Sequence, residues 1–468
     1  MNKIRFFIAL WMSKISVIAL KVFKFRGTNF PGELAIKICP DFLKYINKPK
    51  KILAVTGTNG KTTVNNLVND ILEKDGKRVL SNRFGSNINS GISTSLIHGV
   101  NIFNKCSYDL AAFEIDERSA VRVYPHLKPN YLLITNLSRD SIMRNAHPEY
   151  ISNLLTKYIP KETKLVLNAD DLISCRVAPN NERVYFGLDK MKTDLKERIN
   201  IVSDLEICPK CHSKLKYDYL RYHHIGKAYC PNCDFKSPEY DYKGKVNLEQ
   251  MKIEISTKEE KETFNLINDG VHNMYNELSA IALLKEAGYS FERLKELFKD
   301  VKVVETRFRE NKVKNQRVIM LLSKEKNALG VTRSLDYATS FKGNKQFLLM
   351  MNCLHDEIEW SENTCWLYDC DFEFLNREGI SNIVATGPRY KDYNLRLLLA
   401  GVPKEKIKEA RSELEATKLL NFDEESIIFI LYGTDSIDLA EKVRKKVISE
   451  IEEGGKSNEN WSTISWNM

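Results

Sequence analysis

Residues 54–63, AVTGTNGKTT, decide how the rest of this sequence is interpreted. They overlap the end of an apolar run at residues 51–56, which predicts a short buried strand, and they lead into a helical pattern over residues 62–74. In such a unit the backbone N–H groups of the glycine-rich loop converge on phosphate oxygens, and the helix directs its N-terminus toward the anion. The stretch therefore predicts a nucleotide phosphate loop in an α/β domain.

The side chains of this loop suit ATP. Gly57 and Gly60 let the backbone approach phosphate, Lys61 neutralises charge on the β- and γ-phosphates, and the Thr62 hydroxyl reaches Mg²⁺. Val55 stands where the usual GxxxxGK pattern has its first glycine. The predicted ATP-binding residues of the loop are Gly57, Thr58, Asn59, Gly60, Lys61 and Thr62.

The remainder of the chain predicts two α/β blocks. Apolar runs alternate with helical stretches at residues 79–80, 110–115, 131–135, 165–167 and 184–185, which indicates a mostly parallel sheet. A second set of strands is expected at residues 318–322, 346–351, 382–385 and 426–431. We therefore expect an N-terminal helix and lead-in segment at 1–50, an ATPase domain at 51–304, a Rossmann-like C-terminal α/β domain at 305–455 and a flexible tail at 456–468.

A small inserted module is expected at about residues 200–245, where the alternation of strands and helices stops. Four of the ten cysteines lie there, with the spacing C-x2-C-x18-C-x2-C. Each pair directs two thiolates at one tetrahedral ion, and four sulfur ligands leave no open position. Cys208, Cys211, Cys230 and Cys233 therefore predict a structural zinc ion in a four-cysteine zinc ribbon, with a redox dithiol as the alternative.

The net charge of +9 favours anionic partners such as nucleotides, pyrophosphates, nucleic acid or anionic lipid, although a lysine-rich surface explains it equally well. No long basic run marks a nucleic-acid tail, so we expect no nucleic-acid partner.

The apolar stretch at residues 6–23 lacks a cleavage site, and Lys14 divides it into pieces too short to span a bilayer. It predicts a basic amphipathic helix, which either packs on the next domain or lies on an anionic membrane surface.

Several stretches together carry a family resemblance. They are GTNGKT from Gly57, SNRFGSNINSGI from Ser81, FEIDE from Phe113, LVLNADD from Leu165, GVHNMYNELSAIALLKEAG from Gly270, KNALG from Lys326 and TGPRYKDYNLRLLLAG from Thr386. With the CxxC insert, they resemble the Mur ligase superfamily and, within it, the MurT-type family of lipid II isoglutaminyl synthase subunits. The resemblance implies a Mur-ligase-like ATPase domain followed by a C-terminal α/β domain.

The resemblance also implies roles for residues outside the loop. Glu114 would bind magnesium together with Thr62, Asn273 would contact adenine, Arg307 would clamp the γ-phosphate, and Asp356 would be catalytic toward ammonia. The residues alone leave other readings open, since Glu114 could belong to a solvated strand end, Asn273 could cap a helix, and Arg307 could be a surface residue.

The sequence departs from the family pattern at several of these places. Thr306 replaces the glycine that precedes the family's arginine, and Glu357 and Glu359 replace residues of its acidic D-x-x-D segment. Ser141 and Met143 replace a glutamine and an aspartate after Arg139 and Asp140. These departures are compatible with a divergent substrate or with lost activity.

The activity implied by the resemblance is an ATP-dependent amidation in peptidoglycan synthesis. The α-carboxylate of D-glutamate in the lipid II stem peptide would become D-isoglutamine through an acyl phosphate. The sequence holds no Gly-x-Cys-x-Gly nucleophile elbow, so ammonia would come from a separate GatD-type glutaminase subunit in a heterodimer. The expected location is the cytoplasm, with peripheral contact at the inner membrane face as an open alternative.

Three other functions remain open from the sequence. One is a Mur or folylpolyglutamate-type ligase that adds an amino acid instead of ammonia. Another is a catalytically degenerate ATP-binding paralogue that acts as a scaffold. The third is a zinc-ribbon nucleic-acid binder, which leaves the phosphate loop unexplained.

Overall fold

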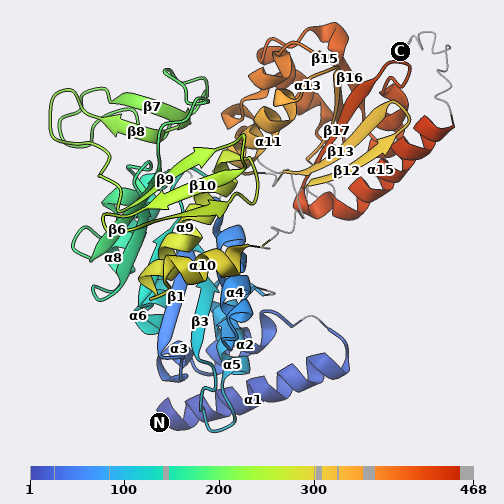
Figure 1. Cartoon of the computed structure of the whole chain (residues 1–468). Coiled ribbons are helices and arrows are strands. Elements are labelled where there is room, and N and C mark those ends of the chain that lie inside the picture. The colour runs from blue at the N-terminus through green and yellow to red at the C-terminus, as the bar shows by residue number, and fades with distance from the viewer. Residues whose placement is uncertain are drawn as a thin grey trace. The chain divides into compact units, whose positions relative to one another are not determined.

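The computed structural model describes residues 2–25, 27–83, 85–140, 147–299, 301, 308–323, 326–351 and 364–453. Its internal contacts divide the chain into two compact units, one within residues 2–139 and 147–301 and the other within residues 308–453 (Figure 1). Each unit has its own central sheet and its own hydrophobic cores. The α/β fold class expected from the sequence is confirmed.

The first unit is built on a nine-stranded sheet in the order β11-β10-β9-β6-β5-β4-β1-β3-β2. The strands from β2 to β9 in this order pair in parallel, and their short aliphatic runs are buried on both faces, as in other sheets covered by helices. Their bounds are β1 Lys51–Thr56, β2 Val79–Ser81, β3 Leu110–Glu114, β4 Tyr131–Ile134, β5 Lys164–Asn168, β6 Arg183–Leu188, β9 Tyr242–Asn247, β10 Lys252–Ser256 and β11 Lys261–Asn265.

Helices cover both faces of this sheet. Ile52 and Ala54 of β1 join a core with α5, α6 and α8, whereas Leu53 and Val55 join a core with α4, α9 and α10. The helices of the unit are α1 Asn2–Val22, α2 Phe30–Ile38, α3 Phe42–Tyr45, α4 Lys61–Lys74, α5 Asn89–Gly99, α6 Ala120–Leu127, α8 Pro148–Tyr158, α9 Val271–Glu286 and α10 Phe291–Phe298.

The N-terminal helix α1 packs on this unit. Phe6, Ala9 and Leu10 are buried in its core, and the helix contacts α2, α3 and α5. The packing expected as one alternative is therefore confirmed for one side of the helix. Among the described residues, no helix combines the length and apolar character needed to cross a membrane.

The segment between β6 and β9 forms a module with its own two-stranded antiparallel sheet. Its strands are β7 Lys216–Tyr222 and β8 Ile225–Tyr229. Strand β9 then returns to the main sheet beside β6, and β10 and β11 extend that sheet antiparallel. This three-stranded edge was not predicted from the sequence, because its strands are short and rich in charged residues.

The second unit has a six-stranded sheet in the order β12-β13-β17-β14-β15-β16, parallel except for β12 at the edge. Its strands are β12 Phe308–Val313, β13 Gln316–Leu322, β14 Lys345–Met350, β15 Ile380–Thr386, β16 Ile407–Ala410 and β17 Ser426–Tyr432. Its helices are α11 Ala328–Ser340, α13 Tyr390–Leu399, α14 Glu413–Ala416 and α15 Ile437–Glu452. Helices α11 and α13 pack in one core, and α14 and α15 in the other.

Candidate nucleotide site and metal centre

The phosphate loop joins the end of β1 to the start of α4. Gly57 and Gly60 have φ angles of +125° and +87°, a backbone conformation that favours glycine, and Gly60 is the N-cap of α4. A Cβ at Gly57 would collide with the Thr135 hydroxyl, and a Cβ at Gly60 would collide with the Asn276 amide. Both glycines are therefore required by the neighbouring residues as well as by the turn itself.

The segment after β4 holds the loop in place. The Thr58 N–H donates to the Asn136 carbonyl at 2.7 Å, and the Asn59 N–H donates to the Asn136 side-chain oxygen at 3.2 Å. The Ser138 N–H donates to the Thr58 hydroxyl, and the Thr135 hydroxyl donates to the Asn59 carbonyl. These partners were not predicted from the sequence. Thr135, Asn136 and Ser138 come directly after β4, the parallel strand that pairs with β1. This position at the end of a neighbouring strand is the signal from which the contacts could have been predicted.

Lys61 lies in the loop and forms a buried ion pair with Glu117, whose side chain is 4% exposed. The Lys61 Nζ is 3.0 Å from Glu117 Oε1 and also donates to the Gly57 and Thr58 carbonyls. Burial lowers the pKa of Lys61, but the carboxylates of Glu117, Glu114 and Asp116 outweigh burial and raise it overall. Lys61 is thus a cation held at the position where the loop would receive phosphate. Glu117 was not predicted as a site residue.

Glu114 ends β3 beside the end of β1, and two asparagines hold it. The Asn87 amide donates to Glu114 Oε1 at 2.7 Å, and Asn82 bonds to the Glu114 main chain. Because Asp116 and Glu117 are buried, the alternative of a solvated strand end is wrong. A partly buried carboxylate at this strand end fits the hard-ligand chemistry of Mg²⁺. The metal role of Glu114 and Thr62 stays a prediction.

The start of α9 borders the same loop. Gly270 is the N-cap of α9, so the alternative that Asn273 caps this helix is wrong. Asn273 lies in the first turn of α9, and the Asn276 amide packs against Gly60. The His272 ring contacts the Tyr222 ring of β7, with centroids 4.6 Å apart. The role of Asn273 in adenine contact stays a prediction, on an element that does reach the loop.

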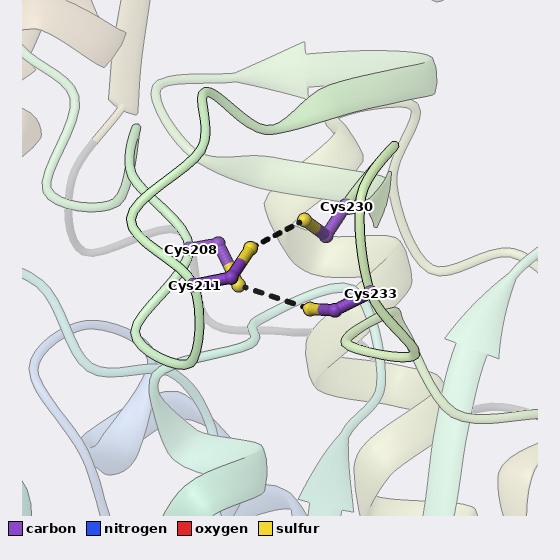
Figure 2. Close-up of side chains that lie close together, drawn as sticks. All are labelled: Cys208, Cys211, Cys230 and Cys233. Carbon is purple, nitrogen blue, oxygen red and sulfur yellow. Dashed lines mark hydrogen bonds between the residues drawn. The ribbon is translucent and has the colours of Figure 1, made fainter.

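The four cysteines of the module come together. Their Sγ atoms all lie within 4.8 Å of one another, with 3.5 Å between Cys208 and Cys233 and 3.3 Å between Cys211 and Cys230 (Figure 2). A tetrahedral zinc ion with Zn–S bonds of about 2.3 Å needs sulfurs about 3.8 Å apart, so the cluster has the required size.

The two turns that carry these cysteines share one geometry. The Lys210 N–H points at Cys208 Sγ, and the Asn232 N–H points at Cys230 Sγ. Such N–H donors stabilise the negative charge of thiolate sulfurs, as the surroundings of a metal site must. The residues present therefore fit a structural zinc site with four cysteine ligands.

A buried aspartate connects the module to the phosphate loop. Asp171 accepts from the Leu137 N–H at 2.7 Å and lies 3.2 Å from His224 Nε2, with both side chains fully buried. Burial lowers the pKa of His224, but Asp171 and Asp204 outweigh burial and raise it. Leu137 follows Asn136, which holds the loop. The module thus contacts the segment that shapes the nucleotide site.

The neighbouring Asp170 makes a different set of contacts. It accepts from the Tyr240 hydroxyl of the module at 2.6 Å and from the Tyr275 hydroxyl of α9 at 2.5 Å. Arg221 of β7 donates to the Leu188 carbonyl and pairs with Asp194. Asp170 therefore joins the module to α9, whereas Asp171 joins it to the loop after β4.

Several predicted site residues lie outside the described residues. These are Arg307, Asp356, Glu359, Ser141 and Met143, and the tail at 456–468 also lies outside them. The described residues break off at Met351, directly after β14, and resume at residue 364. The Tyr393 hydroxyl donates to the Met351 carbonyl at 2.8 Å. In sequence, Asp356 thus follows the carboxyl end of a parallel strand in the middle of the sheet, which is where ligands bind in open α/β sheets.

Two family models match the chain. The Mur ligase middle domain matches residues 55–284, and the MurT ligase C-terminal domain matches residues 325–434. The MurT subunit of lipid II isoglutaminyl synthase (glutamine-hydrolyzing) from Staphylococcus aureus (strain COL) is 30% identical over 397 residues, which cover 84% of this chain and 88% of that protein.

Solved structures show the same fold. A pseudomurein peptide ligase type C from Methanothermus fervidus has a TM-score of 0.64 at 22% identity, covering 87% of this chain and 81% of that one. The MurF ligase from Thermotoga maritima, solved in complex with ADP, has a TM-score of 0.57 at 13% identity, covering 90% and 84%. With a relative 30% identical over most of both chains, this chain belongs to the MurT family of Mur ligases.

Proposed function

We propose that this chain is the ATP-dependent carbon–nitrogen ligase subunit of a lipid II isoglutaminyl synthase. It amidates the α-carboxylate of D-glutamate in the lipid II stem peptide with ammonia. The observation that carries the proposal is the phosphate loop, where Lys61, Glu117 and Glu114 gather at the ends of β1 and β3. The MurT relative, named for this activity, supports the choice of substrate.

The reaction has two steps. A carboxylate oxygen attacks the γ-phosphorus of ATP, ADP leaves, and an acyl phosphate forms. Ammonia then attacks the acyl carbon and loses a proton, and inorganic phosphate leaves as the amide forms. Both steps concentrate negative charge near the γ-phosphate, so preorganised cations supply much of the catalysis.

The residues of the first unit have distinct tasks in this scheme. The backbone N–H groups of residues 57–62 bind the phosphates, Lys61 neutralises their charge, and Asn273 contacts adenine. Glu114 and Thr62 hold Mg²⁺, which when bound offsets charge on the β- and γ-phosphates. The four cysteines hold a structural zinc ion.

The remaining tasks fall to the C-terminal part of the chain and to a partner. Arg307 clamps the γ-phosphate, and Asp356 orients or activates ammonia. A separate GatD-type glutaminase supplies that ammonia within a heterodimer. The reaction takes place in the cytoplasm, at the inner face of the membrane that holds lipid II.

An amidation assay tests the proposal. The chain, co-purified with its glutaminase partner, is incubated with lipid II, ATP, Mg²⁺ and glutamine, and the product is read by mass spectrometry. We expect the loss of about one dalton that accompanies conversion of an acid to an amide. Asp356→Asn should abolish it, while Asp423→Asn, on an exposed bend of the second unit, should not.

Other outcomes would overturn parts of the proposal. A product heavier by an amino-acid residue would identify an amino-acid-adding ligase. ATP binding without any product, with a partner that still hydrolyses glutamine, would identify a scaffold paralogue. Full activity of Asp356→Asn would remove Asp356 from the catalytic site.

A further inference from the structure

Helix α1 is buried on one side, and its opposite side is apolar but exposed. Phe6, Ala9 and Leu10 are buried, whereas Ile15 and Ile18 are 60% and 64% exposed. Large apolar residues seldom gather on one exposed side of a helix unless that side binds something. The exposed apolar residues on this side are Ile4, Ile8, Trp11, Ile15, Ile18 and Val22.

These six residues form one continuous stripe. With a rotation of about 100° per residue, they fall within an arc of about 80°, and the buried residues lie on the opposite side of the helix. The stripe runs the whole length of α1, because its first and last members lie at residues 4 and 22. Its regularity distinguishes it from scattered surface leucines and isoleucines.

A neighbouring loop enlarges the surface. The Trp11 indole N–H donates to the Ile102 carbonyl at 2.9 Å, and Lys14 Nζ donates to the Val100 carbonyl at 2.5 Å. The loop at residues 101–105 therefore lies beside α1, and its Ile102 and Phe103 side chains are also exposed. We call the helix and this loop together the α1 surface.

Basic residues border this surface. Lys3 and Lys21 lie along one edge of the stripe and Arg5 along the other, as the helical rotation places them. No aspartate or glutamate occurs before Glu33. An apolar stripe between basic edges matches the interface of an anionic bilayer, where acyl chains lie beneath negatively charged headgroups.

The same features disfavour a second copy of the chain as the occupant. Two such helices would bring their basic edges together, and neither helix carries an acidic residue to pair with them. A bilayer-spanning helix is also disfavoured, because one side of α1 is committed to the core of its unit.

We propose that the α1 surface binds an anionic phospholipid bilayer, with the helix axis parallel to the membrane plane. Trp11 and the isoleucines enter the headgroup–acyl boundary, and Lys3, Arg5 and Lys21 contact phosphate headgroups. Membrane binding would place the chain beside a lipid-anchored substrate, and only this purpose rests on the proposed function.

Vesicle sedimentation tests the proposal, with the full chain and without nucleotide or lipid II. We expect binding at least about tenfold tighter to phosphatidylcholine vesicles that contain phosphatidylglycerol than to pure phosphatidylcholine, weakening as salt rises. The double variant Ile15→Asp/Ile18→Asp should lose this binding. A matched control is Leu395→Asp/Leu399→Asp, because these exposed leucines lie on α13 of the second unit.

A second variant tests the electrostatic attraction between the basic residues of α1 and the anionic headgroups. Lys3→Gln/Lys21→Gln should reduce the preference for anionic vesicles while keeping the apolar stripe. Thermal unfolding and nucleotide binding of every variant show whether the unit still folds.

Equal sedimentation with both vesicle types, or unchanged binding of the folded Ile15→Asp/Ile18→Asp variant, would overturn the proposal. Loss of the glutaminase partner instead of vesicle binding would assign the surface to a protein. Amidation of a lipid-free stem peptide separates this inference from the proposed function, because the isoleucine variant should retain it.

Discussion

The cysteine cluster and the phosphate loop are built in opposite ways. All four sulfurs of the cluster come from two similar turns between residues 208 and 233. The phosphate loop is equally short, but its conformation depends on Asn136, Glu117 and Asn276, which are distant in sequence. A site contained in one segment shows itself in residue spacing, whereas a site assembled at strand ends depends on the fold around it.

The largest expected effect comes from removing the cation of the assembled site. Lys61→Met should reduce the amidation rate about 10²- to 10³-fold, because an uncompensated Glu117 would then face the incoming phosphates. The rate of amide formation by the co-purified complex, followed by mass spectrometry, measures it. Lys77→Met is the matched control, because this lysine lies beyond the end of α4 and is half-exposed. Equal activity of the two variants would refute the role of Lys61.

The second prediction breaks the contained site. Cys230→Ser should lower the zinc content from about one ion per chain to none and destabilise the module by at least about 3 kcal/mol. Elemental analysis and thermal unfolding measure both effects. Cys365→Ser, at an exposed cysteine outside the cluster, should change neither. A zinc-loaded Cys230→Ser protein would contradict the assignment.

The third prediction concerns Glu277 of α9, the helix that borders the phosphate loop. Burial raises the pKa of Glu277 to about 8, and its Oε2 accepts from the Ile267 N–H. The folded state therefore keeps a proton that the unfolded state loses above its ordinary pKa. The stability contributed by this proton is full below about pH 4.5 and falls as pH rises toward 8.

The matching variant is Glu277→Gln, which keeps a hydrogen-bond acceptor and cannot ionise. The free energy of unfolding of the parent should fall between pH 5 and pH 8, and in the variant this fall should be smaller by up to about 3 kcal/mol. Denaturant unfolding at both pH values measures the difference. An identical pH dependence in variant and parent would show that Glu277 ionises normally.

The smallest expected effect tests the link between the two regions. Asp171→Asn should weaken ATP binding about tenfold, because Asp171 holds both the Leu137 N–H and the His224 ring. Asp170→Asn is the matched comparison, since Asp170 contacts tyrosines of the module and of α9 instead. Calorimetric titration with an ATP analogue should separate the two variants. A larger effect of Asp170→Asn on ATP affinity would reverse the assignment.

The features that are formed within one short segment of the chain were predictable from the sequence. The two CxxC pairs, the GTNGKT loop and the strand at residues 51–56 each combine a motif with its required context, and the structure has all three. The parallel strands of both units other than β9 and β16 were also expected, because their aliphatic runs are short and bounded by turn residues. Strand β16 was missed, since its four residues, IKEA, form no such run. The strands β9 to β11 were missed, since alternating charged residues conceal a half-buried pattern.

The partners of the phosphate loop could not be predicted in the same way. Asn136 follows β4 and Glu117 follows β3, the two parallel strands that flank β1, but their contacts with Thr58 and Lys61 depend on how those strands align with β1. Spacing along the chain carries no record of that alignment. Arg307 and Asp356 stay predictions from the family resemblance and from the position of Asp356 after β14.

The most direct test of the central claim follows the oxygen atoms of the carboxylate. Lipid II labelled with oxygen-18 in the D-glutamate α-carboxylate is amidated by the complex, and the released phosphate is analysed by mass spectrometry. Activation through an acyl phosphate predicts that each phosphate carries one labelled oxygen from the substrate. Unlabelled phosphate would show that ATP is hydrolysed without activating the carboxylate, and it would contradict the proposed ligase mechanism.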